Sequence, residues 1–261
     1  MADATLAPVS MDAVLPAWRV RAWHAYLLVG LASVAVYYRL PKAGWAQCVL
    51  LSVLNATAAL ASTWAAARSH GSRRVAWIGL ALAMLLSTAG NAPYFGYSLV
   101  KHRPLPFPSY VDALLLAAFP FFALALVAFV RSHRGPRRLW AELLAAGLML
   151  GGGVALWLTM VEPTERVPLT GLAHRVSVAY PVLDVAIFVL LVAFVVGARR
   201  WNASAAWMVA SFVAMLVGAM VFSAQVADGS YAYGGVTDGL WMLSYLLVGV
   251  AALHPSAATR S

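Results

Sequence analysis

The stretch Val176-Ser-Val-Ala-Tyr-Pro-Val-Leu-Asp184-Val-Ala-Ile-Phe-Val-Leu-Leu191 places one aspartate inside an apolar run that is long enough to cross a membrane. A span needs about 20 apolar residues, because each helical residue advances about 1.5 Å and the hydrocarbon core is about 30 Å thick. Counted from Val176, Asp184 lies about 12 Å deep. A carboxylate at that depth costs about 3 kcal/mol or more, so it normally faces a protein interior, a partner or a cavity. We therefore expect the functional site around Asp184.

The composition extends this membrane interpretation to the whole chain. Of its 261 residues, 63% are hydrophobic and 10% are charged, whereas a soluble domain carries about 25% charged residues. The N-terminus, with Asp3 and Asp12, lacks the pattern of a cleaved signal peptide. The single cysteine, Cys48, excludes a disulfide framework and a zinc cluster. The six histidines show no ligand spacing, so neither a metal nor another cofactor is predicted.

Eight apolar runs predict an all-α integral membrane protein with eight transmembrane helices. The predicted spans are residues 23–40, 45–67, 75–99, 109–130, 139–160, 172–198, 204–227 and 236–253. They form a single membrane domain over residues 23–253, which lies between an N-terminal cytoplasmic segment (1–22) and a C-terminal tail (254–261).

The distribution of the basic residues predicts the orientation of these spans. The termini and the loops on their side hold twelve Arg and Lys residues, and the opposite loops hold six. Cytoplasmic loops carry the excess of Arg and Lys, so both termini are predicted to be cytoplasmic. The net charge of +9 first suggests a nucleic-acid partner. Because the arginines are spread over short loops, where they meet lipid headgroups, the sequence favours membrane lipids as partners and no nucleic acid.

The two halves of the membrane domain resemble each other at an offset of 126 residues, which brings Ser109-Tyr-Val-Asp112-Ala-Leu onto Gly235-Val-Thr-Asp238-Gly-Leu. An aromatic residue, Phe119 or Tyr245, follows each aspartate by seven residues. Four spans per half give the halves, about 23–130 and 139–253, the same topology. This predicts two parallel four-helix repeats with a site between them. The alternative is that apolar helices resemble each other by composition alone.

Polar and aromatic side chains within the spans supply the candidate site. Asp184, Asp112 and Asp238 are the candidate catalytic acids, with Asp184 the deepest. The candidate substrate-binding residues are Tyr180, Trp241, Tyr245, Asn91, Tyr94, Phe119, Trp157 and Glu162. Together they predict an aromatic-walled cavity with a polar floor, open toward the outer half of the membrane.

Two interpretations of the aspartates stay open. A carboxyl group buried at the depth of Asp184 is expected to hold its proton, and such a group is a candidate general acid. Alternatively, Asp184 hydrogen-bonds a neighbouring tyrosine or a kinked backbone and only joins helices. Asp112 and Asp238 lie near the first turn of their helices, where a carboxylate often serves only as a cap.

Several short motifs follow one another from Phe107 to Ser256. They are Phe107-Pro-Ser-Tyr-Val-Asp112-Ala-Leu, Phe119-Pro120, Trp157 with Glu162-Pro163, Ala179-Tyr-Pro-Val-Leu-Asp184, and Asp238-Gly-Leu-Trp-Met-Leu-Ser-Tyr245 ending in Ala-Ala-Leu-His254-Pro-Ser256. In this order they resemble a multi-helix membrane module that actinobacteria carry ahead of GGDEF and EAL domains in membrane-bound cyclic di-GMP enzymes. The resemblance runs from about the third helix to the end. It implies a sensor or anchor in a bacterial cytoplasmic membrane that binds a lipophilic ligand or partner helices.

The chain departs from that module at three places. Gly90-Asn91 stands where the module usually has Gly-Asp, and Val217-Gly-Ala-Met-Val-Phe222 stands where it tends to have an aspartate. The sequence also stops at Ser261, where the output domain would begin in the family.

As a chain without an output domain, the protein also looks like a bacterial membrane-bound terpene cyclase. This second likeness is one of size, topology and site chemistry. It implies that a protonated aspartate donates to a terminal alkene of a lipophilic prenylated substrate. Aromatic faces would stabilise the carbocation, and a dry cavity would exclude water. The sequence thus leans toward an isoprenoid cyclase of natural-product biosynthesis, with the sensor module as the alternative. A small transporter is a further alternative that the repeat permits.

Overall fold

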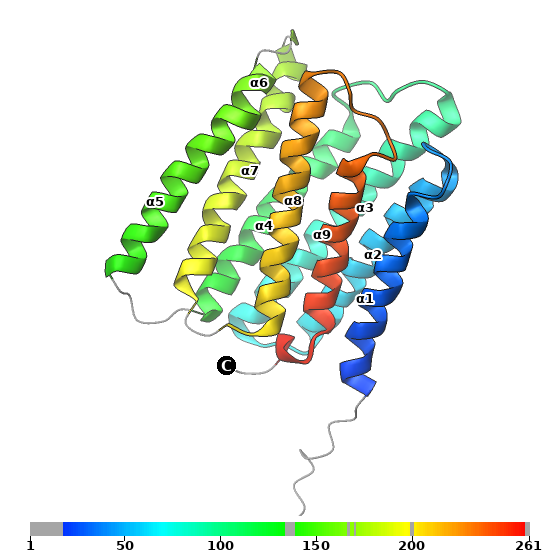
Figure 1. The fold of residues 1–261 in the computed structure, drawn as a ribbon. Helices are drawn as coiled ribbons and strands as arrows, with labels where there is room; N and C mark the ends of the chain where they lie inside the picture. Colours follow the sequence, from blue (N-terminus) through cyan, green and yellow to red (C-terminus); the bar gives the residue numbers. More distant parts are fainter. Residues whose placement is uncertain (1–17, 134–138, 166–167, 170, 199–200, 259–261) are drawn as a thin grey trace, which may run out of the picture.

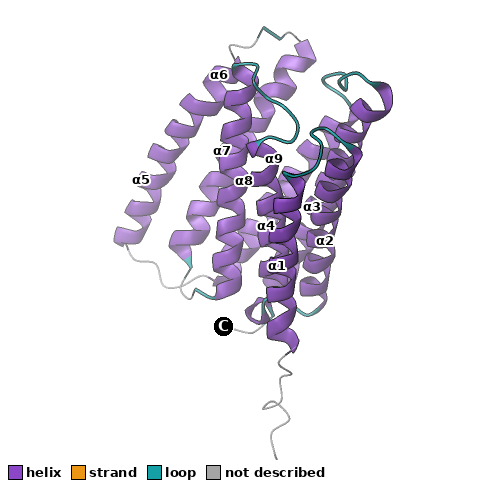
Figure 2. Cartoon of the chain, turned by 45° about the vertical axis from the view of Figure 1, so that its right-hand side comes forward, coloured by secondary structure: helices purple, strands orange, loops and turns teal. Residues whose placement is uncertain are grey.

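The computed structural model describes residues 18–133, 139–165, 168–169, 171–198 and 201–258, and these residues form a bundle of long helices (Figure 1). The long helices are α1 (Trp18–Tyr37), α2 (Trp45–Ala67), α3 (Gly71–Lys101), α4 (Tyr110–His133), α5 (Leu139–Leu156), α7 (Gly171–Gly197), α8 (Ala203–Ala227) and α9 (Val236–Leu253). The short elements are η2 (Trp157–Val161), α6 (Glu162–Glu165) and η3 (Pro255–Ala257). Figure 2 shows the long helices side by side.

Seven described helices are long and apolar enough to cross a membrane. The predicted spans 45–67 and 236–253 coincide with α2 and α9. These features are those of a multi-pass membrane protein, as the sequence predicted. The described apolar part of α1, Ala22–Tyr37, is shorter than the other seven, so an eighth span stays a prediction.

The bundle has two ends, which we name from Figure 1. The loops 38–44, 102–109 and 228–235 lie at the upper end, and the loop 68–70 and the C-terminal element η3 lie at the lower end. Helix α9 packs against α1, α2 and α8, whereas α4 packs against α3 and α7. Helix α5 stands at the edge and packs mainly against α7. Accordingly 72% of the span in α9 is buried inside the bundle, against 17% for the span that includes α5.

The backbones of α3 and α4 approach each other closely at Gly79 of α3. A Cβ atom added at Gly79 would lie 2.9 Å from the carbonyl oxygen of Phe121 and 3.2 Å from the amide nitrogen of Ala125. Both neighbours are backbone atoms, so they cannot turn aside as a flexible side chain would. Small residues at such crossings let helices pack closely where no water drives them together.

The fifth predicted span continues past α5 through a single wider turn. In η2 the backbone is π-helical, and the amide of Glu162 donates to the carbonyl of Trp157, five residues earlier. Pro163 follows at once and has no N–H to donate. Such single π-helical turns inside α-helices are often found at functional sites. Trp157 and Glu162, both predicted site residues, lie at this turn.

Candidate functional site

The described structure brings four of the predicted polar residues together at the upper end, with tyrosines that the prediction did not include. We call this group the upper-end cluster, and its members come from five helices and one loop. They are Asp112, Asp238, Tyr37, Tyr94, Tyr180, Tyr231 and Tyr233.

Asp238 is the most enclosed member of the upper-end cluster. It lies in the first turn of α9 and is 0% exposed. Its Oδ2 accepts a hydrogen bond of 2.6 Å from the hydroxyl of Tyr37 in α1 and one of 2.7 Å from the amide of Gly234. Tyr37 is itself only 1% exposed. The carboxylate therefore joins α9 to α1 and to the loop that precedes α9.

The second oxygen of the Asp238 carboxylate, Oδ1, differs from Oδ2 because it is buried and accepts no hydrogen bond from any described residue. The hydroxyl of Tyr231 is also buried, and it neither donates to nor accepts from a described residue. Burial first, and the charge of Asp238 next, raise the pKa of Tyr231, which lies in the loop between α8 and α9. The phenol therefore keeps its proton beside the carboxylate. A buried polar group without a partner costs about 1–3 kcal/mol.

A glycine and a glutamine shape the loop that reaches Asp238. Gly234 has a positive φ of 81°, which L side chains rarely adopt. A Cβ atom there would lie 3.1 Å from the side-chain amide of Gln47. That amide is fixed on both sides, because its oxygen accepts from the Ala43 amide at 2.8 Å and its nitrogen donates to the Tyr37 carbonyl at 2.9 Å. The loop thus presents the Gly234 N–H to Asp238.

Asp112, the counterpart of Asp238 in the predicted repeat, is bound in a similar way. Its Oδ2 accepts from the amide of Ser109 at 2.7 Å and from the hydroxyl of the same serine at 3.3 Å. Its Oδ1 accepts from the hydroxyl of Tyr180 in α7 at 3.0 Å. Each aspartate therefore satisfies a backbone amide just before its helix, which agrees with the capping interpretation. In addition, each receives a tyrosine hydroxyl from another helix.

Aromatic rings connect the parts of the upper-end cluster. The ring of Tyr233 lies 5.8 Å from Tyr94 and 5.6 Å from Tyr231, measured between centroids. On the other side, Phe119 lies 6.3 Å from Tyr180. These separations are typical of edge-to-face contacts between aromatic side chains. Tyr94 and Phe119, both predicted site residues, thus contact the tyrosines of the upper-end cluster.

Asp184 lies apart from the hydrogen bonds of the upper-end cluster. It occupies the buried face of α7, which also carries Pro181, Ile187, Leu191 and Phe194 at helical spacing. It is 5% exposed. Among the described residues it has no hydrogen-bond or ion-pair partner, and Tyr180 one turn earlier donates to Asp112 instead. The hydrogen bond to a neighbouring tyrosine that one interpretation expected for Asp184 is therefore absent from the described part of the chain.

The remaining predicted residues lie at several places. Asn91 of α3 donates a hydrogen bond of 3.0 Å to the hydroxyl of Tyr245 in α9, and both side chains are buried. Trp241 packs against α8, 5.4 Å from Phe222 between ring centroids. Trp157 is 46% exposed on the outside of the bundle, and Glu162 is half-buried.

A small hollow lies beside the upper-end cluster, and part of it is open to the surroundings. Its lining includes Tyr37, Gln47, Cys48, Phe95 and Tyr233. Tyr37 therefore contacts the hollow and donates to Asp238 at the same time. Neither this hollow nor a second one at the lower end is lined by Asp112, Asp184 or Asp238. Within the described ranges, no three or more His, Cys, Asp or Glu side chains are grouped so that they could hold a metal ion.

The sequence interpretation missed Tyr37, Tyr231 and Tyr233 because each lies at the end of a helix or in a loop. One signal in the sequence was nevertheless available. Tyr37-Tyr38 and Tyr231-Ala-Tyr233 place pairs of tyrosines at the predicted outer edges of spans. Tyrosine at such an edge is usually interpreted as an interfacial anchor, and only the tertiary contacts identify it as the partner of a carboxylate.

The fold and the site together define a class: a multi-pass helical membrane protein with an aspartate–tyrosine cluster at one end. No protein-family model matches the chain, and no curated protein or solved structure shows a significant similarity to it.

Proposed function

We propose that the chain is the membrane-embedded sensor or anchor module of a signalling protein, in which aspartate–tyrosine bonds join helices across the bundle. The observation that carries this proposal is the pair of bonds Tyr37–Asp238 and Tyr180–Asp112. Two of the three candidate acids are thereby engaged in holding helices together. Acids that join helices are expected in a module that responds to a lipophilic ligand or to partner helices. In an enzyme, the acids would instead line the active-site cavity.

The proposal includes the two parallel repeats and the eight spans, with α1 as the first span. Helix α4 begins at Tyr110 and α9 at Val236, 126 residues apart, and α2 and α7 begin 126 residues apart as well, at Trp45 and Gly171. Helix α9 packs against α2, as α4 packs against α7. An even number of spans places both termini on one side, and the basic lower loops favour the cytoplasmic side of a bacterial membrane.

Helix α9 is the element that would transmit a signal. It carries Asp238 in its first turn and ends at Leu253, directly before His254 and η3. Its 18 residues span about 27 Å as a rigid helix. A ligand that breaks the Tyr37–Asp238 bond at the upper end would therefore change how α9 is held, and α9 leads straight to the C-terminal segment at the lower end. This supplies a physical connection between the two ends.

The sensor proposal is tested by joining a diguanylate cyclase domain after Ser261 and measuring cyclic di-GMP in membranes. Tyr37→Phe removes one buried hydrogen bond worth about 1 kcal/mol, so the output should change by up to about fivefold in either direction. Tyr110→Phe is the matched control, because Tyr110 is 62% exposed. If both variants signal like the unaltered chain, the bond has no part in signalling and this function is wrong.

A second candidate function, proton-initiated isoprenoid cyclisation, is favoured by one observation: Asp184 is buried in α7 without a partner among the described residues. In that reaction the carboxylic acid protonates a terminal alkene, an internal alkene closes the ring on the cation, and loss of a proton returns the acid. Membranes would convert a linear prenylated substrate into a cyclic isomer of unchanged mass. Asp184→Asn should lower this rate by about 100-fold or more, and the exposed Asp228→Asn should not. Full activity in Asp184→Asn would exclude Asp184 as the proton donor.

A further inference from the structure

A histidine at the lower end of α9 caps the short element that follows it. His254 is the N-cap of η3, because its Nδ1 accepts a hydrogen bond of 3.2 Å from the backbone amide of Ser256. Pro255 between them has no N–H, so this amide is the first donor of η3. The amide of Ala257 donates to the His254 carbonyl at 2.9 Å and completes the turn. We call this arrangement the His254 cap.

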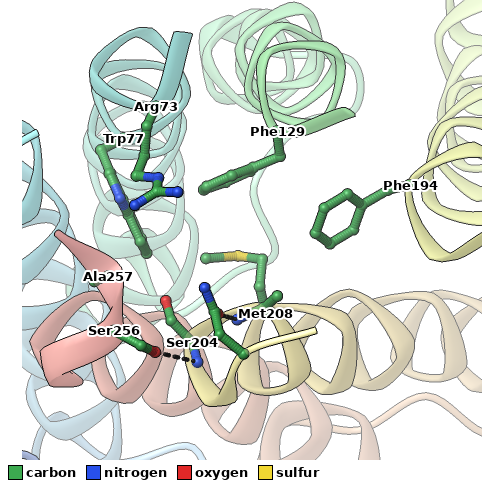
Figure 3. A pocket seen from close by; sticks show the side chains of 10 residues that line it. Arg73, Trp77, Phe129, Phe194, Ser204, Met208, Ser256 and Ala257 are labelled. Atoms are coloured by element: carbon green, nitrogen blue, oxygen red, sulfur yellow. Dashed lines mark hydrogen bonds between the residues drawn. The ribbon is translucent and has the colours of Figure 1, made fainter. Parts of the chain in front are cut away.

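Ser256 also connects η3 to α8 and α9. Its hydroxyl lies 2.9 Å from the Nδ1 of the capping histidine and accepts from the amide of Ser204, in the first turn of α8, at 3.1 Å. The Ser204 hydroxyl in turn donates to the Ala251 carbonyl of α9 at 2.7 Å. Figure 3 shows the Ser204–Ser256 bond beside the lower-end hollow, which Arg73 and Trp77 of α3 also line. The His254 cap therefore lies at the junction of η3, α8 and α9.

The His254 cap requires an uncharged imidazole. A backbone N–H can only donate, so Nδ1 must offer its lone pair and the ring proton must be on Nε2. In the charged ring both nitrogens carry protons, and the Nδ1–H would then face the N–H of Ser256. The Ser256 hydroxyl can still accept from the charged ring, so the bond that is lost is the one to the backbone amide that starts η3.

The surroundings of the His254 cap favour the uncharged ring. Among the described residues, the charged or titratable groups that face it are His24 of α1 and Arg73 of α3. The neighbouring turns of α8 and α9, residues 203–209 and 246–253, contain no Asp, Glu, Lys, Arg or His. Burial first, and His24 next, lower the pKa of His254. The bond is therefore complete above the ordinary histidine pKa of about 6.5 and is lost as the pH falls through the lowered value.

We propose that the His254 cap is a pH-sensitive switch: the neutral ring holds η3 against α8 and α9, and protonation of the ring releases η3. The signal is a fall in pH on the side of the membrane where the lower end lies. The released segment is the one that directly follows α9, so the lower end changes without any change in the upper-end cluster. The switch depends on neither the sensor nor the cyclase candidate.

The test measures the mobility of η3 directly, in the full chain in nanodiscs. Cys48→Ala removes the single natural thiol, and Ala258→Cys, directly after η3, carries a nitroxide spin label. Between pH 8 and pH 5 the mobile fraction of the label should rise by about fivefold, which is the effect of losing one helix cap. The midpoint should lie below pH 6.5. A label that is equally immobile at both pH values overturns the proposal.

Two substitutions of the histidine separate its charge from its role as an acceptor. In His254→Asn a side-chain oxygen that does not titrate can accept from the same amide, so the label should stay immobile at every pH. In His254→Ala the acceptor is gone, and the label should be mobile already at pH 8. A pH transition that persists in His254→Asn, or a label that is immobile at pH 8 in His254→Ala, overturns the proposal.

Two other histidines provide the matched controls. His24→Gln removes the titratable neighbour, so the transition should remain and its midpoint should move to higher pH. His70→Gln changes an exposed histidine in another loop at the lower end, and it should leave the transition unchanged. Loss of the transition in either control would assign the proton to a residue other than His254 and would overturn the proposal.

Discussion

Replacing Asp238 with alanine is expected to lower the free energy of unfolding by about 2–5 kcal/mol. The substitution removes the acceptor of two buried donors, the Tyr37 hydroxyl and the Gly234 amide. Each buried donor left without an acceptor costs about 1–3 kcal/mol. The measurement is reversible unfolding in detergent micelles with added denaturing detergent.

Asp238→Asn is the matched control for this prediction. An amide oxygen still accepts from both donors, and the amide nitrogen replaces the carboxylate oxygen that has no partner among the described residues. Asparagine should therefore remain within about 1 kcal/mol of the unaltered protein. If Asp238→Ala is as stable as the unaltered protein, the bonds to Tyr37 and Gly234 do not hold α9 in place.

Replacing Asp184 with leucine is expected to have the opposite effect and to raise the free energy of unfolding by about 2–3 kcal/mol. Leucine has the same branching as aspartate, so it fits the buried face of α7 with little change in shape. A central aspartate costs about 3 kcal/mol in a membrane helix, whereas leucine is slightly favourable. Asp184 recovers none of this cost through a hydrogen bond or ion pair with the described residues. The same unfolding measurement applies.

The sign of this change distinguishes the two interpretations of Asp184. A gain in stability means that the residue is kept at a cost to the fold, which is typical of functional positions. Val185→Leu, at the next position of α7, is a control for general effects of enlarging this helix. A loss of stability in Asp184→Leu, with Val185→Leu unchanged, would show that Asp184 joins helices and would remove the main support for the cyclase candidate.

The contrast between Asp238 and Asp184 shows which features of the site the sequence could predict and which it could not. Both were identified from the sequence as costly charges within apolar runs. This identification needs only the hydropathy of the run and the rise of a helix per residue. Whether a tyrosine reaches the carboxylate depends on contacts between distant residues, since Tyr37 and Asp238 are 201 positions apart. Tyr180 was predicted beside Asp184 because the two share a helix face. It bonds to Asp112 of α4 instead, because its long side chain reaches across the helix interface.

The sequence by itself determined the membrane class and the ends of most helices. The reason is that a span is a local property: a run of apolar residues of fixed length, bounded by basic or proline-containing loops, predicts α2 and α9 without knowledge of their neighbours. The tertiary structure alone decided which acids have partners, that Tyr37 and Tyr231 surround Asp238, and that Arg73 and Trp77 face a hollow with η3. These facts depend on how each helix is rotated about its axis, and packing against neighbouring helices sets that rotation.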